Sequence, residues 1–405
     1  GPWGHVCPNL GGPGPKAGFL QLALDWWDHW LKGIDNGVME QPAFLAYLQD
    51  SHAPDPNPSD RPGRWVAEPG WPSPNIVATR FNLSPGQLLS DQKDTAGTAK
   101  ICSPVTLGLR TGEYMPISGV AELPQDQSAD DALSVCFDGP SLSEPLEILG
   151  TTYVNLRVSS DCGHGMVATR ICDVAPDGVS TLISYGLLNL KQRDGREICA
   201  RITPGEPMDV SVRLNDTGWS LKPGHRLRLA LSSHLWPMAW PQPKQATLCL
   251  DLAHCSMILP VRTSDASTEA HHPFADPVSA PPPSHEYVAP ASGSRNVRHD
   301  IHSGLVELDA RSDSGKIRFE DIDLTFGSMN SQLYSIVEGD PLSARIEYKA
   351  SFSFYREGWE VQTESKLVTT CDAENFNLEG WISAHEAGER VFSRRWDVKI
   401  PRVVF

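Results

Sequence analysis

A histidine close to the start of the chain has the local surroundings that proton-transfer chemistry needs. His5 follows a Gly-Pro-Trp-Gly segment, and residues 1–18 contain three Gly-Pro steps, which prevent regular secondary structure. An imidazole on a loop can project toward a reacting group and move while it accepts and returns a proton. His5 is therefore the first candidate for a catalytic residue. The alternative is an ordinary exposed histidine near a chain end.

A long apolar helix is predicted directly after this loop, over residues 19–32 (FLQLALDWWDHWLK). Apolar side chains recur at helical spacing, and the stripe includes Trp26, Trp27 and Trp30. Gly33 is a natural C-cap for this helix. Its length of about 21 Å is enough to cover one face of a sheet. We expect that sheet to lie outside this chain, so the three tryptophans need a partner surface.

Five blocks of sequence carry a family resemblance, and their order along the chain is more informative than any one of them. They are Gly-Pro-Trp-x-His, the tryptophan-rich helix ending Leu31-Lys32-Gly33, and the blocks 170–178 (RICDVAPDG), 222–229 (KPGHRLRL) and 232–237 (SSHLWP). Together they resemble the cocaine-esterase and X-Pro dipeptidyl-peptidase family of serine hydrolases, over roughly the first two-thirds of the chain. The resemblance implies that His5 is the general base of a Ser-Asp-His triad. It also implies hydrolysis of ester or X-Pro amide bonds without a cofactor.

The other two members of such a triad are not found. In α/β-hydrolases the triad follows the chain order Ser, Asp, His, and the serine stands in Gly-x-Ser-x-Gly. No such motif occurs here, and Asp25 and Asp28 belong to the solvated face of the predicted helix. We therefore expect a truncated chain whose nucleophile and acid lie upstream of Gly1, in a missing N-terminal hydrolase domain. Such a chain would be inactive alone.

The remaining reactive side chains give weaker candidates. Cys7 lies two residues from His5, but neighbouring loop residues rarely present both groups to one substrate. The close His and Cys groups lack the paired spacing of a metal site, so we predict no metal and no cofactor. These groups are Cys162 with His164, Cys249 with His254 and Cys255, and the pair His271-His272.

An aromatic-proline loop is the candidate for a substrate pocket. Trp236 and Trp240 each precede a proline, and in the resembled family a matching loop lies near the catalytic domain. The resemblance thus implies that the two tryptophans could line an acyl pocket, which favours aromatic walls. The alternative, which we favour, is packing between domains. His225 is expected to be structural, through a hydrogen-bonded His–Arg pair with Arg226 at the start of a central strand.

Short runs with period-2 alternation predict a mainly β fold. Such runs include 154–158, 210–214 and 227–231, and Gly, Pro or Asp turns separate them. The resemblance implies that this part is a jelly-roll β-sandwich. A proline-rich linker follows, and further alternating runs after it predict a second antiparallel β module with a hairpin turn at Gly388. The predicted parts are a remnant of an α/β-hydrolase domain (1–50), a connecting loop (51–75), the jelly roll (76–262), the linker (263–288) and the added module (289–405).

Composition restricts the partners and the compartment. The chain has 405 residues, with 50 acidic against 34 basic side chains and a formal net charge of −16. This balance argues against nucleic acid and against an anionic membrane surface as partners. No apolar run of membrane-spanning length occurs. Nine scattered cysteines without CxxC pairs predict reduced thiols and a cytoplasmic location.

Two functional hypotheses follow. The first is the C-terminal part of a serine hydrolase of the esterase or dipeptidyl-peptidase type, either truncated or completed by a separately made N-terminal half. The second is a non-catalytic β-sandwich protein that binds carbohydrate or a protein partner. An aromatic platform with polar neighbours on an exposed face would favour the second hypothesis. A homodimer is compatible with both.

Overall fold

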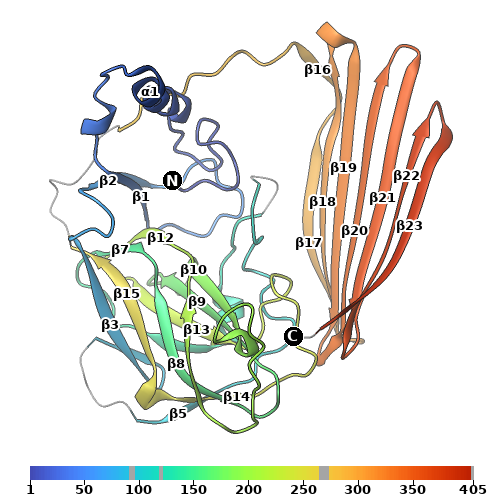
Figure 1. The fold of residues 1–405 in the computed structure, drawn as a ribbon. Coiled ribbons are helices and arrows are strands. Elements are labelled where there is room, and N and C mark those ends of the chain that lie inside the picture. Colours follow the sequence, from blue (N-terminus) through green and yellow to red (C-terminus); the bar gives the residue numbers. More distant parts are fainter. Residues whose placement is uncertain (91–95, 118–121, 264–272, 403–405) are drawn as a thin grey trace.

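The protein, seen in a computed structural model, consists mainly of β-strands arranged in two separate sheets (Figure 1). The structure describes residues 1–90, 96–117, 122–263 and 273–402. The first sheet curls on itself, and the second stands beside it as a long antiparallel layer (Figure 1). The predicted mainly β fold with a second antiparallel module is thus confirmed. The domain boundaries and the jelly-roll connectivity stay predictions.

The first sheet contains all described strands up to residue 262. Helix α1 precedes these strands, and short helices lie between α1 and β1 and in the connections of the sheet. The strands are β1 (Phe44–Asp50), β2 (Gly63–Glu68), β3 (Ile76–Ser84), β4 (Gln87–Leu89), β5 (Thr98–Ile101), β6 (Val135–Asp138), β7 (Leu146–Gly150), β8 (Tyr153–Ser160), β9 (Met166–Val174), β10 (Ser180–Asn189), β11 (Met208–Arg213), β12 (Thr217–Leu221), β13 (Arg226–Ser232), β14 (Leu248–Asp251) and β15 (Ser256–Arg262). The helices are α1 (Phe19–Lys32), η1 (Val38–Glu40), α2 (Ser128–Asp131), η2 (Leu190–Gln192) and η3 (Leu252–His254).

The alternating apolar residues of these strands form a common core. Val154, Leu156 and Val158 of β8 are buried, whereas the residues between them are only partly covered. Strand β11 shows the same alternation, and the apolar residues of β13 join the same core. The strands predicted at these three runs are therefore present, and their apolar faces point inward as period-2 geometry requires.

Strand β2 lies within residues 51–75, which the sequence analysis assigned to a connecting loop. It pairs antiparallel with β1, from Phe44 opposite Glu68 to Gln49 opposite Gly63, and β1 continues the sheet through a parallel pairing with β12. The loop expectation needs this correction because the prolines nearby conceal a short run whose strand state depends on its partner. Such pairing is a property of the folded sheet rather than of the local sequence.

The second sheet is built from long neighbouring strands in simple antiparallel order. They are β16 (His285–Ala289), β17 (Ser292–Asp300), β18 (Leu305–Phe319), β19 (Leu324–Val337), β20 (Asp340–Arg356), β21 (Trp359–Cys371), β22 (Asn375–Glu386) and β23 (Glu389–Pro401), with helix η5 (Glu320–Ile322) between β18 and β19. The predicted hairpin turn at Gly388 joins β22 to β23. Ala387 and Gly388 both have positive φ, 50° and 81°, as a tight hairpin turn of this type needs.

The two faces of the second sheet differ in chemistry. We call the face that meets the first sheet the contact face; it carries Val306, Ile336 and Ala344, all buried. The strand register places Phe352 and Trp396 on this same face, because residues opposite one another across a sheet share a side. The opposite side, the outer face, is mainly polar.

Charged side chains dominate the outer face. The Glu347 carboxylate forms ion pairs with Arg345, Lys349 and Lys366, at N–O distances of 2.5, 2.7 and 3.2 Å. Hydrogen bonds from Lys349 and then Arg345 lower the pKa of the Glu347 carboxyl to about 2. The outer face is therefore built for water, and the contact face is built for an apolar neighbour.

An aromatic contact joins the two sheets at one end. Trp236 is 1% exposed and lies with Val105 on the side of the first sheet. Both side chains pack against Val306 and Ile336 of the second sheet. Trp240 lies beside it, and its indole N–H donates to the Sγ atom of Cys371 at 3.2 Å. Burying such side chains stabilises the contact by about 2–3 kcal/mol for each large one.

Helix α1 forms where the sequence predicts it, but nothing in the described chain covers its apolar face. None of its residues is buried, and Trp26, Trp27 and Trp30 are 44%, 54% and 55% exposed. Gly33 ends the helix in the left-handed conformation, as expected for a C-cap. The predicted need of this helix for a partner surface therefore persists in the structure.

Part of the predicted linker returns to the N-terminal region. Gln21 of α1 donates to the Asp276 carbonyl at 3.0 Å, and Asn9 donates to the Val278 carbonyl at 2.9 Å. The Phe274 and Trp65 rings lie 4.8 Å apart, edge to face. The linker therefore fastens the N-terminal loop and α1 to the first sheet before it crosses to the second (Figure 1).

A buried carboxylate connects three distant parts of the first sheet. Asp173 of β9 is 2% exposed and accepts hydrogen bonds from Trp219 at 3.0 Å, from His225 at 2.7 Å and from Ser51. His225 is thus structural, as predicted, but its partner is an acid and not Arg226, which is exposed. The expected His–Arg pair needs this correction, because the partner comes from another strand.

Replacing this carboxylate should destabilise the protein strongly. Asp173→Ala removes the acceptor shared by Trp219, His225 and Ser51, and it leaves the buried Trp219 indole N–H without this partner. We therefore expect a loss of about 2–4 kcal/mol in the free energy of unfolding, measured by urea denaturation. The matched control is Asp209→Ala, which removes a 75% exposed carboxylate paired with Arg157 and should cost less than about 1 kcal/mol. Equal losses in the two variants would contradict the role given to Asp173.

Candidate functional site

His5 lies on the surface of the N-terminal loop. It is exposed, and its backbone N–H donates to the Pro116 carbonyl at 2.6 Å. The loop is fixed on both sides of the histidine, because Gly4 N–H donates to Gly12 and the Trp3 indole donates to Pro15 at 2.7 Å. The backbone of His5 is thus held, while its imidazole is free to meet a group that approaches from outside.

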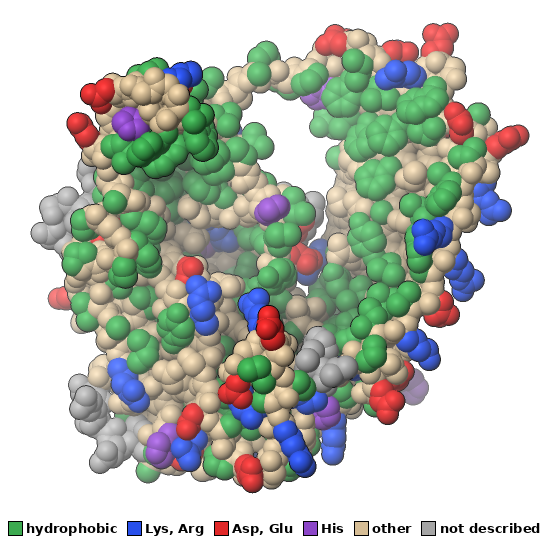
Figure 2. Space-filling view, viewed as in Figure 1, with side chains coloured by type: hydrophobic (Ala, Val, Ile, Leu, Met, Phe, Trp, Pro, Cys, Tyr) green, Lys and Arg blue, Asp and Glu red, His purple; other side chains and the backbone are tan. Residues whose placement is uncertain are grey.

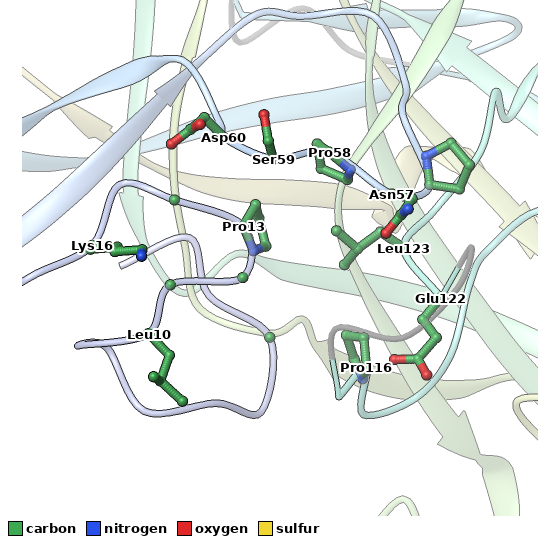
Figure 3. A pocket seen from close by; sticks show the side chains of 15 residues that line it. Leu10, Pro13, Lys16, Asn57, Pro58, Ser59, Asp60, Pro116, Glu122 and Leu123 are labelled. Carbon is green, nitrogen blue, oxygen red and sulfur yellow. The ribbon is translucent and has the colours of Figure 1, made fainter. Parts of the chain in front are cut away.

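A cavity of about 370 Å³ lies beside this loop (Figure 3). One side is formed by residues 10–14 and Lys16, and the other by Pro116 and Glu122 (Figure 3). Asp60 contributes a second carboxylate. These side chains could hold a polar group, but the lining contains no paired nucleophile and base with which this cavity could hydrolyse a substrate by itself.

The segment that holds His5 also reaches the second sheet. Glu113, three residues before the carbonyl that binds His5, forms an ion pair with Arg295 of β17, whose side chain is 5% exposed. Burial and the nearby Glu113 charge raise the pKa of Tyr334, on β19, to about 12. No sequence motif predicts these contacts. They place the His5 loop next to the contact face.

Trp236 and Trp240 occupy the interface between the two sheets. The Trp236 ring lies 6.3 Å from Tyr334, and the Trp240 ring lies 5.4 Å from Phe376, both edge to face. Neither tryptophan lines the cavity beside His5. Their positions favour packing between the two β parts, the alternative preferred from the sequence, over an acyl pocket.

Metal chemistry finds no support within the described ranges. No group of three or more His, Cys, Asp or Glu side chains there could hold a metal ion. His271 and His272, one of the candidate groups, lie outside the described residues. All nine cysteines are described, and all are free thiols. Among the described helices, none combines the length and the apolar character needed to cross a membrane.

Comparison with known families identifies the greater part of the chain. Residues 36–274 match the family profile described as the X-Pro dipeptidyl-peptidase C-terminal non-catalytic domain. The chain belongs to this family. The X-Pro dipeptidyl-peptidase C-terminal domain thus includes the first sheet with β1 and β2, whereas His5 and the second sheet lie outside the matched residues.

Relatives named as esterases are similar to part of this chain. The cocaine esterase of a Rhodococcus strain is 28% identical over 189 residues, which covers 43% of this chain and 32% of the esterase. A Mycobacterium bovis protein named as a serine esterase is 27% identical over 261 residues, covering 57% of this chain and 39% of the relative. The resemblance stated from the sequence is confirmed. The chain spans less than half of the length of these relatives.

Solved structures match part of this chain at low sequence identity. A CocE/NonD family hydrolase from Staphylococcus aureus has a TM-score of 0.46 at 15% identity, over 60% of this chain and 45% of its own. An aminopeptidase from a marine sediment archaeon gives 0.49 at 17% identity, over 59% and 43%.

A buried histidine next to Trp236 makes the domain sensitive to acid. His234 is 2% exposed, and burial lowers its pKa from the ordinary 6.5 to about 4. The unfolded chain therefore binds the proton more readily than the folded one between these values. Stability is consequently lost as the pH falls from about 6.5 toward about 4.

Replacing His234 should remove part of this loss. The quantity to compare is the decrease in the free energy of unfolding between pH 7 and pH 4, measured by urea titration. This decrease should be roughly 3 kcal/mol smaller in His234→Gln than in the unmodified protein. The control is His254→Gln, at a histidine whose side chain is 58% exposed, and it should keep the full acid sensitivity. An unchanged pH dependence in His234→Gln would contradict this assignment.

Proposed function

We propose that this chain is the C-terminal part of a serine hydrolase that cleaves esters or X-Pro amides, with His5 as its general base. The observation that carries the proposal is an exposed His5 on a fixed loop, followed by a helix whose tryptophan face is covered by none of the described residues. The names of the related hydrolases support the reaction class. The nucleophilic serine and the acid belong to an α/β-hydrolase domain that packs on α1.

The proposed reaction assigns one task to this chain. The imidazole of His5 takes the proton of the serine hydroxyl as the oxygen attacks the substrate carbonyl, and it then gives that proton to the leaving alkoxide or amine. Water repeats the sequence to release the acyl group. The fixed backbone of the His5 loop orients the ring, and the acid of the hydrolase domain selects its tautomer. The nine free cysteines are consistent with a cytoplasmic location.

The test uses the complete hydrolase, meaning this chain together with the domain that carries the serine and the acid. His5→Ala should lower kcat for a chromogenic ester by about 10⁴-fold or more. His254→Ala, at an exposed histidine of η3, is the matched control and should leave kcat unchanged. Retention of most activity in His5→Ala would refute the proposal.

A hollow on the outer face favours a second candidate function, carbohydrate binding. Trp381 is 38% exposed and stands between Lys366 and Arg395 on neighbouring strands. Arg345 lines the same hollow. An aromatic ring flanked by cations suits an acidic sugar, which stacks on the ring and shares Lys366 and Arg395 with their partners Glu347 and Glu379.

This second function predicts a binding defect that is independent of hydrolysis. Trp381→Ala should weaken the binding of an acidic oligosaccharide, measured by calorimetry, by about tenfold, since stacking and cation contacts contribute about 1–2 kcal/mol. His5→Ala should bind as the unmodified protein does. If neither the unmodified protein nor the His5 variant binds acidic oligosaccharides, this candidate function is wrong.

A further inference from the structure

Part of the contact face of the second sheet is left uncovered by the described residues. The end that meets Trp236 is buried, with Val306 and Ile336 at 3% and 0% exposure. Farther along the same face, Phe352 is 40% exposed and Phe392 51%. A sheet with one apolar face normally packs that face against another layer, and an apolar patch of this extent marks an interaction site.

The uncovered apolar surface is continuous with an interface that already exists. Leu367 and Trp396 are 41% and 39% exposed, and the register aligns them with Tyr348 and Gln332 on the side of Tyr334, whose ring contacts Trp236. The contact with the first sheet therefore occupies one part of a larger surface of the same kind.

This surface and the tryptophan face of α1 border the same open space. Figure 1 shows α1 and the second sheet on opposite sides of an opening under the linker, and Figure 2 shows that side chains do not fill it. Hydrophobic side chains gather on both sides of it (Figure 2). The segment of Glu113 and Pro116 connects the sides, because it pairs with Arg295 and also holds the backbone of His5.

We propose that the uncovered contact face is a docking surface for the α/β-hydrolase domain, which fills the opening and touches both α1 and the second sheet. This inference rests on the proposed function. A domain that brings its serine to His5 must lie against the His5 loop, and Glu113 on the segment holding that loop is paired to β17 of the second sheet. The second sheet then clamps the hydrolase domain from the side opposite α1 and buries its own apolar face.

Two tryptophans of nearly equal exposure provide the test. Trp396 on the contact face is 39% exposed and Trp381 on the outer face 38% exposed in this chain. Hydroxyl-radical footprinting of the complete hydrolase, read by mass spectrometry, should show Trp396 oxidised severalfold more slowly than Trp381. Equal oxidation rates of the two tryptophans would overturn the inference. The sample must be shown to be monomeric by sedimentation.

The remaining outcomes separate this inference from its premise. If Trp396 is protected only in a dimer, a second copy of the chain covers the face and the inference is wrong. If Trp396 is oxidised as fast as Trp381 while His5→Ala abolishes hydrolysis, the proposed function stands. Only the docking of the hydrolase domain on the contact face is then refuted. If hydrolysis survives His5→Ala, the proposed function is wrong. The inference is then wrong as well, because it needs a hydrolase domain that brings its serine to His5.

Discussion

The packing of Trp236 and Trp240 against the second sheet is the interaction on which the arrangement of the molecule depends. A single antiparallel layer has no core of its own, so its position is set by what its apolar face touches. These two tryptophans cover one end of that face, through Tyr334 and Phe376. The rest of the face is thereby held over the opening that the His5 loop borders.

Local sequence patterns predict the strands well, because alternation is a property of the segment itself. The run from Val154 to Val158 and the turn at Gly388 both occur as expected. Alternation does not say what covers the apolar side. Trp396, Val398 and Ile400 alternate as regularly as β8 does, yet each is more than a third exposed. The neighbouring Arg394 side chain lies over the Trp396 ring, but no second layer of the described chain covers these residues.

The candidate site likewise has one part that the local sequence predicts and another part that it does not. The Gly-Pro-Trp-Gly-His loop and the helix after it are short-range motifs, and the structure shows the loop, the exposed His5 and the helix where they are expected. The groups that hold this loop come from far along the chain. Pro116 binds its backbone and Glu113 pairs with Arg295, and no local pattern indicates contacts formed only by tertiary packing. The same reason explains why Asp173, and not an arginine, is the partner of His225.

The central claim is that the imidazole of His5 serves a serine supplied by an α/β-hydrolase domain. The most direct measurement is a crystal structure of the complete hydrolase whose serine has been trapped with a phosphonate ester. The account predicts the Nε2 atom of His5 at about 3 Å from the Oγ atom of the modified serine. A structure in which another histidine takes that place, with His5 still facing solvent, would contradict it.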